Sequence, residues 1–420
     1  MANPITNAHL HVFTADHAPD DFLRIQLGKG GLLARPIKWV LENTPIRKIP
    51  SVLKRLLLIP GIKGNSTFWR TVSFLETGLL PNQREIWRNG ESGFSWLGET
   101  DMRFVPLSLN MDHMTDRISK HTRIDEQLEE LANMKRYAPN QILPFLSVDP
   151  RLARDSKELL QWVQKWWNKY PNTWSGLKLY PALGYFPFDE RLFDVYAWAE
   201  KEGIPFMTHC TRAGVYYIGT PSGLRKQVQR GLGNRTNPTH DHFTPITNLI
   251  NAFLAKDELM KNENASELFG NPYMYVPVLD QFPKLKLCLA HFGGSNEVIR
   301  NPGQALNSPS AKMEFKILHN NIIVTWADQI RDLIASGLYP NLYTDISYTL
   351  CDIAALKQIM AWASTAPYQA LNDKVVFGTD FFMILNEGEE DIISKAAYLE
   401  MGPVVFNKWA RINTVNYLGG

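Results

Sequence analysis

Short apolar segments alternate with segments of helical periodicity along most of this chain. The longer segments repeat apolar residues at helical spacing, as residues 156–170 and 352–364 do, and an Asp or Ser often stands where a helix cap is needed. Eight segments of strand length are apolar throughout, and they cover residues 5–13, 102–111, 142–149, 175–181, 204–210, 285–293, 342–348 and 375–382. Such strands, separated by helices, indicate a parallel sheet covered on both faces.

Eight repeats of strand and helix predict a closed (β/α)8 barrel, the TIM barrel of the α/β class. The alternative is an open doubly wound sheet, but no glycine-rich phosphate loop follows the first strand to favour it. A chain of 420 residues is long enough for two domains, and it also fits a barrel with insertions. We expect one barrel domain that spans residues 1–420.

Three of the predicted connections are long, and they cover residues 14–101, 211–284 and 294–341. In a barrel, the connections that follow strands emerge on the catalytic face, where long ones often build a lid or a substrate wall. We therefore expect residues 14–101 and 211–284 to form cap-like insertions over the barrel mouth or against a neighbouring subunit. A homodimer is one arrangement that would satisfy this expectation.

The composition indicates a soluble protein. Hydrophobic residues make up 45% of the chain and the net charge is +2, so the overall charge does not indicate nucleic-acid binding. The three cysteines have no CxxC spacing, which fits a reducing compartment. No basic leader precedes an apolar stretch, and no apolar run reaches about 18 residues. We expect a cytoplasmic protein with no transmembrane segment.

Residues 20–70 carry ten Lys and Arg against three acidic residues, an excess of +7. One interpretation is a solvated cap helix with a buried apolar face. The others are a wall that attracts an anionic substrate, or a contact with another subunit or a membrane surface.

The first strand segment contains His9 and His11, two histidines separated by one residue. A strand alternates its side chains with period 2, so both rings point to one side, roughly 7 Å apart. Imidazole is the commonest neutral metal ligand, so the pair could hold one cation. The alternative is a pair of half-buried structural histidines.

Other residues that can bind metal stand at the ends of later strand segments: Lys178, His209, His291 and Asp380. The carboxyl ends of barrel strands meet on the catalytic face. A lysine inside an apolar strand is costly unless it is paired or chemically modified. Several such residues at one barrel edge predict a single metal centre.

These residues and their surroundings resemble the amidohydrolase superfamily, and most of all its amidohydrolase-related branch, which also contains decarboxylases and lactonases of carboxylated substrates. The resemblance covers nearly the whole chain in order, except the two insertions. Its motifs are NAHLHVF from residue 7, GLKLYP from 176, THC from 208, FPKLKLCLAHFGG from 282, LYTDISY from 342, VVFGTD from 375 and INTVNYLG from 412.

The resemblance implies a distorted TIM barrel with one or two divalent ions, usually zinc. In the one-metal plan the ligands would be His9, His11, His209 and Asp380, and His291 would be free for acid–base work. In the two-metal plan His291 is also a ligand, and a carboxylated Lys178 bridges the ions. The chain has the complete set for either plan.

Ligation by two or three His and one Asp leaves a coordination position open for water, as catalytic zinc requires. We expect Asp380 to act as general base and His291 as a second catalytic residue. Asp345 could orient a ligand histidine, or it could cap a helix. Arg212 and Tyr180 are the predicted substrate-binding residues, with the Arg212 guanidinium on a substrate carboxylate.

The predicted function is a metal-dependent hydrolase of a small ester, lactone or amide that carries a carboxylate. The alternative is a metal-dependent, non-oxidative decarboxylase, a lyase on the same scaffold. The third reading is an inactive barrel whose insertions bind a partner. A second pair, His240 and His242, lies in a polar segment that predicts a lid or a solvated loop.

Overall fold

The computed structural model of this chain describes residues 3–19, 66–98, 101–116, 123–233, 243–301 and 306–419. All of its named strands pair in parallel, β1 with β2 and β3 to β8 in chain order. Their bounds are β1 Ile5–Leu10, β2 Met102–Pro106, β3 Phe145–Ser147, β4 Gly176–Leu179, β5 Phe206–Thr208, β6 Leu287–Leu289, β7 Leu342–Asp345 and β8 Val375–Val376.

Backbone contacts at two seams close these strands into a barrel. At one seam Leu10 pairs with Phe381, and the Ala8 N–H donates to the Phe377 carbonyl at 2.9 Å. At the other, Phe104 at β2 pairs with Ile142, just before β3. The predicted TIM barrel is therefore confirmed, and each predicted strand segment contains one strand.

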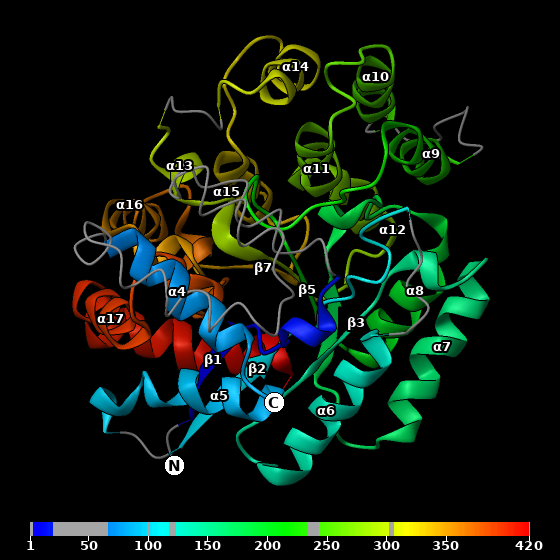
Figure 1. The fold of residues 1–420 in the computed structure, drawn as a ribbon. Helices are drawn as coiled ribbons and strands as arrows, with labels where there is room; N and C mark the ends of the chain where they lie inside the picture. The colour runs from blue at the N-terminus through cyan, green and yellow to red at the C-terminus, as the bar shows by residue number, and fades with distance from the viewer. Residues whose placement is uncertain are drawn as a thin grey trace, which may run out of the picture.

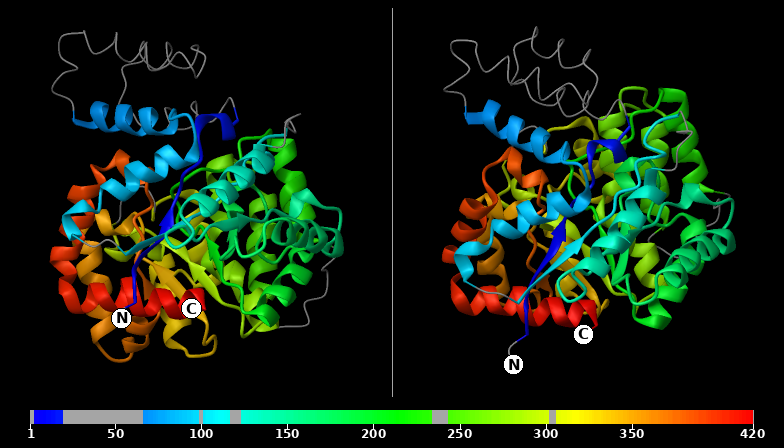
Figure 2. Two further views of the ribbon diagram at one scale, coloured as in Figure 1. Left: turned by 90° about the horizontal axis from the view of Figure 1, so that it is seen from below. Right: turned by 60° about the horizontal axis from the view of Figure 1, so that its bottom comes forward.

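Helices surround the barrel, as Figures 1 and 2 show. The helices that connect successive strands directly are α6 Arg123–Tyr137, α7 Ser156–Lys169, α8 Phe193–Glu202 and α16 Ile353–Ser364, and α17 Glu390–Asn407 follows β8. Between β5 and β6 lie α9 Pro221–Leu232, α10 Phe243–Leu254, α11 Asn262–Gly270 and α12 Val276–Gln281. Between β6 and β7 lie α13 Ser295–Val298, α14 Pro309–Leu318 and α15 Trp326–Ala335.

The expected helix caps are present. The Asp155 side chain accepts a hydrogen bond from the Glu158 N–H at the start of α7. Asp352 accepts from the N–H groups of Ala354 and Ala355 at the start of α16. Each cap satisfies donors that would otherwise lack a partner, so these helices begin where the sequence predicts.

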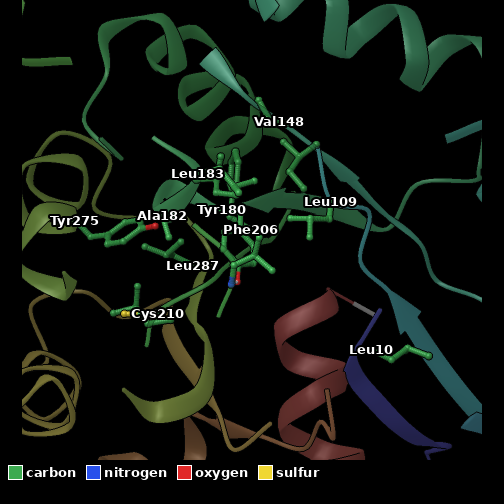
Figure 3. Close-up of a cluster of buried hydrophobic side chains, with 14 of the residues drawn as sticks. Leu10, Leu109, Val148, Tyr180, Ala182, Leu183, Phe206, Cys210, Tyr275 and Leu287 are labelled. Atoms are coloured by element: carbon green, nitrogen blue, oxygen red, sulfur yellow. The ribbon is translucent and has the colours of Figure 1, made fainter. Parts of the chain in front are cut away.

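Two large apolar clusters form most of the core of the described residues, and a third, of Leu306, Ala311 and Phe315, lies in α14 and just before it. The larger of the two lies between the barrel and its helices, and Figure 3 shows its part around β5, where Tyr180, Phe206 and Leu287 come together. The smaller one fills the barrel interior with one side chain from each of several strands, among them Val105, Met207 and Cys288. Tyr417, from the C-terminal helix α18 Thr414–Leu418, belongs to this interior cluster, and its hydroxyl donates to the Phe206 carbonyl at 2.8 Å.

The described part of the first insertion packs on the barrel body. It contains α4 Ser66–Gly78 and α5 Gln83–Ser92, whose apolar residues belong to the larger core cluster. The Phe74 ring contacts the Phe382 ring with centroids 5.2 Å apart, and Trp96 donates to Ser394 of α17 at 3.1 Å. The basic stretch predicted at 20–70 lies almost entirely outside the described residues, as do His240 and His242.

Among the helices of the described residues, none combines the length and the apolar composition needed to span a membrane.

Candidate metal centre

His9, His11 and Asp380 come together where β1 meets the segment that follows β8. The Nε2 atoms of His9 and His11 lie 3.4 and 3.6 Å from Asp380 Oδ1. One ligand atom from each of the three buried residues lies within 4.8 Å of the other two. Such a group has the size and the donor set that a divalent cation needs.

The backbone places Asp380 close to β1. The Asp380 N–H donates to the His9 carbonyl at 2.8 Å, and Asp380 has a φ of 67°. Gly378 makes this approach possible, because a Cβ atom there would lie 2.7 Å from His9 Cβ. A non-glycine residue at positive φ costs of order 1–3 kcal/mol, so the rest of the structure must hold Asp380 in place.

The outer nitrogens of the two β1 histidines are bonded, which fixes the direction of their inner nitrogens. His9 Nδ1 lies 2.8 Å from Asp345 Oδ2, and His11 Nδ1 lies 3.1 Å from the Leu107 carbonyl. These acceptors require N–H groups at Nδ1, so both Nε2 atoms present lone pairs toward Asp380.

Three buried polar atoms of this centre have no hydrogen-bond partner: His9 Nε2, Asp380 Oδ1 and Lys178 Nζ. Burial lowers the pKa of His9 to about 3 and raises the pKa of Asp380 well above its usual range. Unpartnered buried lone pairs are unfavourable. A divalent cation would satisfy the lone pairs on His9 and Asp380, so the residues present fit a metal.

Lys178 points into the barrel interior from β4. It is fully buried, and its Nζ lies 5.8 Å from the centroid of the Tyr180 ring. Burial lowers the pKa of Lys178 to about 8. The structure therefore brings this lysine to the same interior as the histidines, as the sequence predicts.

His209 and His291 form a second pair beside this centre. His209 Nδ1 lies 3.1 Å from His291 Nε2. The outer nitrogens face carbonyl oxygens, since His209 Nε2 donates to Ala213 at 2.8 Å and His291 Nδ1 donates to Ser347 at 3.0 Å. The two inner nitrogens can then hydrogen bond to each other only when the pair holds one additional proton. Without that proton, both can offer their lone pairs to a cation.

His209 therefore differs from its predicted place in the one-metal plan. Its Nδ1 faces His291, and the structure does not bring it into the group of His9, His11 and Asp380. His291 lies with its ring centroid 4.8 Å from that of His9. A further group, His9, His291 and Asp345, is drawn together by hydrogen bonds within the site.

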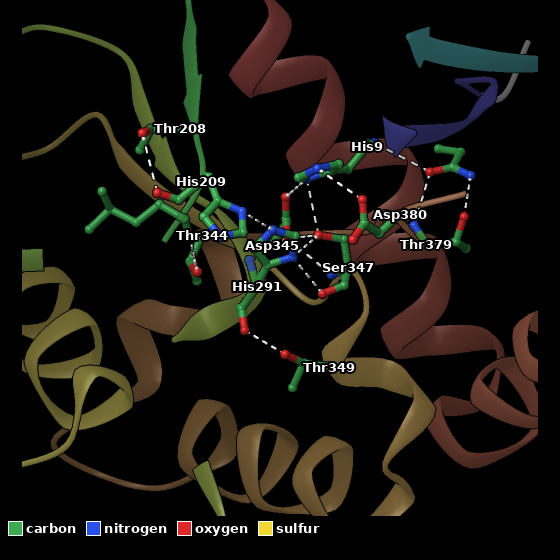
Figure 4. Close-up of polar contacts among 12 residues, drawn as sticks. His9, Thr208, His209, His291, Thr344, Asp345, Ser347, Thr349, Thr379 and Asp380 are labelled. Atoms are coloured by element: carbon green, nitrogen blue, oxygen red, sulfur yellow. Dashed lines mark hydrogen bonds and ion pairs between the residues drawn. The ribbon is translucent and has the colours of Figure 1, made fainter. Parts of the chain in front are cut away.

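Asp345, at the end of β7, supports both histidine groups (Figure 4). Its Oδ2 accepts from His9 Nδ1, and its Oδ1 accepts from the backbone N–H groups of His291 at 2.8 Å and Ser347 at 3.0 Å. Burial alone would raise the pKa of Asp345, but His9, His291 and the Ser347 hydroxyl together hold it far below its usual value. The carboxylate therefore orients the ring of His9, which the sequence predicts to be a metal ligand.

Tyr180 lies against His209 rather than at an open substrate site. The two rings stack with centroids 4.1 Å apart, and the Tyr180 hydroxyl accepts from the Val215 N–H at 3.1 Å. The side chain is buried. Its position indicates that it holds the His209 ring in place.

Arg212 is not available for a substrate carboxylate, contrary to expectation. Its guanidinium donates to Glu267, Glu297 and Glu314 at 2.7, 2.9 and 2.8 Å. It also lies over the Trp326 ring, 4.5 Å from the centroid. Three carboxylates and a ring surround the group, so Arg212 ties the insertions after β5 and β6 together.

Sequence reasoning missed Ser347, whose hydroxyl lies between His9 and His291. The signal available was its place two residues after Asp345 in a segment already assigned to a strand end. Asp112, which follows β2, accepts a hydrogen bond from the Ile124 N–H at the start of α6.

Comparisons with known proteins agree with the barrel fold. A family model described as amidohydrolase matches residues 172–409. No curated protein matches the chain significantly. Among solved structures, a 5-carboxyvanillate decarboxylase from Novosphingobium aromaticivorans with bound manganese has a TM-score of 0.51 at 12% identity, covering 100% of this chain and 97% of its own. An uncharacterised TIM-barrel protein from Bordetella bronchiseptica has a TM-score of 0.48 at 14% identity, covering 99% of this chain and 100% of its own.

Proposed function

The chain belongs to the amidohydrolase family, and we propose that it is a metal-dependent decarboxylase, a lyase that releases carbon dioxide from a small carboxylated substrate. The contact between His209 and His291 carries the proposal. A decarboxylase must deliver a proton to the carbon atom that carbon dioxide leaves, and two inner nitrogens 3.1 Å apart can hold one. The likeness of fold to a decarboxylase that binds manganese supports it.

In this proposal His9, His11 and Asp380 hold the cation, which is zinc or another divalent ion such as manganese. When bound, the ion supplies a Lewis acid that binds and polarises oxygen atoms of an anionic substrate. His291 then protonates the carbon atom next to the leaving carboxylate. The carbon–carbon bond breaks, its electron pair remains on that carbon, and water returns a proton to the histidine pair.

Hydrolysis, the first function predicted from the sequence, uses the same residues differently. Asp380 lies at the proposed cation and would take a proton from water there. Hydrolysis yields an acid and an alcohol or amine, and releases no carbon dioxide. The product therefore separates the two functions.

The number of ions is a further part of the proposal. A carbamate on Lys178 would add an anionic ligand beside the lone pairs of His209 and His291, and a second ion would then fit the interior. The free amine would leave one ion on His9, His11 and Asp380. Metal analysis of protein loaded in bicarbonate, with ¹³C NMR for the carbamate, measures which arrangement holds.

The test is a panel of aromatic and aliphatic carboxylates, with matched esters and lactones, assayed for carbon dioxide release by protein loaded with zinc or manganese. We expect carbon dioxide, and deuterium on the vacated carbon in D₂O. His291→Asn should lower kcat by about 10²–10⁴ without loss of bound metal. His319→Asn is the matched control, since that half-buried histidine lies at the end of α14. Turnover of esters or lactones alone would contradict the decarboxylase.

A further inference from the structure

Ser347 places one hydroxyl between two histidines of the site. Its Oγ lies 3.0 Å from His9 Nδ1 and 2.9 Å from His291 Nδ1. The same oxygen lies 2.5 Å from Asp345 Oδ1, and all four side chains are buried (Figure 4). One group therefore contacts a proposed metal ligand and the proposed proton donor at once.

The hydrogen-bond donors and acceptors of this cluster can be assigned by counting protons. The ionised Asp345 carboxylate can only accept, so the single hydroxyl proton of Ser347 goes to it. The remaining lone pairs of the Ser347 oxygen can only accept. Contacts from His9 Nδ1 and His291 Nδ1 must then be N–H donors.

The other partners of the two rings lead to the same assignment. His9 Nδ1 also faces Asp345 Oδ2 at 2.8 Å, and His291 Nδ1 also faces the Ser347 carbonyl at 3.0 Å. Both are acceptors without a proton to give. Each histidine is therefore held with its proton on Nδ1 and a lone pair on Nε2, the atom that points inward.

We propose that Ser347 is a positioning residue that fixes His9 and His291 in one shared tautomer, so that His9 Nε2 keeps a lone pair for the centre and His291 Nε2 is free to take up and pass on the proton that it shares with His209. The tautomer assignment stands on hydrogen bonds alone. The use of the His9 lone pair for a cation rests on the proposed function. A hydrogen bond to the second ring nitrogen of a metal-binding histidine orients that histidine. Breaking such a bond weakens metal binding about 10–100-fold.

The competing explanation is that Ser347 only stabilises the turn after β7. Its N–H donates to Asp345 Oδ1, a local contact that a Ser347→Ala variant keeps. In that case loss of the hydroxyl would lower stability without changing either imidazole. Thr344 provides the matched control, because its buried hydroxyl, on the same strand, donates to the Leu289 carbonyl at 2.6 Å and contacts neither histidine.

The first measurement uses the metal-free full-length protein labelled with ¹⁵N at histidine, with signals assigned through single His→Gln variants. Ring ¹⁵N shifts distinguish a protonated from an unprotonated nitrogen. At high pH, where His209 and His291 hold no shared proton, we expect protonated Nδ1 and unprotonated Nε2 in both His9 and His291. A protonated Nε2 with a bare Nδ1 in either ring would overturn the proposal.

The second measurement is the affinity of each variant for Zn²⁺, by competition with a chelator, beside the visible spectrum of the Co²⁺ form. Ser347→Ala should weaken Zn²⁺ binding about 10–100-fold and change the Co²⁺ spectrum, while Ser347→Thr restores both and Thr344→Val changes neither. If Ser347→Ala and Thr344→Val changed the Zn²⁺ affinity and the Co²⁺ spectrum equally, the proposed positioning role would be wrong. If wild-type protein holds no metal but shows the expected tautomers, the proposed function fails and the tautomer assignment stands.

Discussion

Glu390 is a buried acid, and among the described residues neither carboxylate oxygen has a hydrogen-bond partner of normal geometry. Burial raises its pKa to about 8, against an ordinary value of 4.5. The folded protein therefore holds a proton here that the unfolded chain releases above pH 4.5. By linkage, the stability that Glu390 contributes is lost progressively as pH rises from about 4.5 to 8.

A Glu390→Gln variant should remove this pH dependence. We expect it to match wild type near pH 5 and to be more stable by about 2–4 kcal/mol at pH 8, because one pKa unit corresponds to about 1.4 kcal/mol. Urea unfolding at both pH values measures the difference. The neighbouring Glu389 is exposed, so Glu389→Gln should leave the pH profile unchanged; equal profiles for wild type and Glu390→Gln would contradict the argument.

A variant of Arg212 can distinguish a structural role for this residue from a role in substrate binding. Arg212→Met would leave Glu267, Glu297 and Glu314 without their shared cation. We expect a loss of about 3–5 kcal/mol in unfolding free energy, because breaking a buried ion pair leaves uncompensated charge. A substrate-binding Arg212 would instead raise KM at unchanged stability. Arg225→Met, which removes a pair with the exposed Asp257, should cost about 1 kcal/mol or less.

At the scale of elements, the seam between β1 and β8 decides whether the metal centre forms. Gly378→Ala would place a Cβ atom 2.7 Å from His9 Cβ and 3.0 Å from the His9 backbone nitrogen. Backbone cannot yield as a side chain can, so the seam must open. We expect a loss of about 1–3 kcal/mol in stability and weaker binding of metal.

Gly388→Ala is the control for this prediction. It lies in the same connection, and the nearest atom to its added Cβ is the flexible end of Ile393, at 3.2 Å. Calorimetry and metal content measured on both variants test the seam. Full metal content in Gly378→Ala would show that the seam tolerates a wider spacing.

The sequence predicts elements better than it predicts their ends. The predicted segment 375–382 contains a strand of only two residues, Val375–Val376. The chain leaves the sheet after it, so that Asp380 can turn toward His9 with positive φ. A run of apolar residues indicates burial, but it does not indicate where the backbone stops pairing.

At the scale of the whole molecule, the periodicity of the sequence predicts both the barrel and the group of polar residues at one of its edges. The carboxyl ends of barrel strands meet at that edge whatever path the connections take. The partners of Arg212 could not be predicted in this way, since they lie 55, 85 and 102 residues away in the insertions. Ser347 was missed because its role depends on rings from β1 and from the segment that follows β6. The single-domain organisation and a homodimer remain predictions.

The proposed cation should stabilise the whole protein, because its proposed ligands come from the first strand and from the segment that follows the last strand. Free Zn²⁺ or Mn²⁺ at 100 times Kd should raise the unfolding free energy by about 2.7 kcal/mol, with a matching rise in Tm. Thermal unfolding with metal and with chelator measures the effect. A variant with both His9→Ala and His11→Ala should show no such shift and hold no metal, whereas His319→Ala should behave as wild type.

The seam also has a consequence for kinetics. Asn7 and Thr379, which hydrogen bond across it, are 372 residues apart in the chain. Contacts between residues so far apart in the chain have a large entropic cost early in folding. The seam should therefore close after the rate-limiting barrier to folding. A ligand that binds only the closed seam then acts on one direction of the reaction: it should slow unfolding and leave the refolding rate unchanged. The bound metal would slow the opening of the folded barrel, and its removal would shorten the lifetime of the native state.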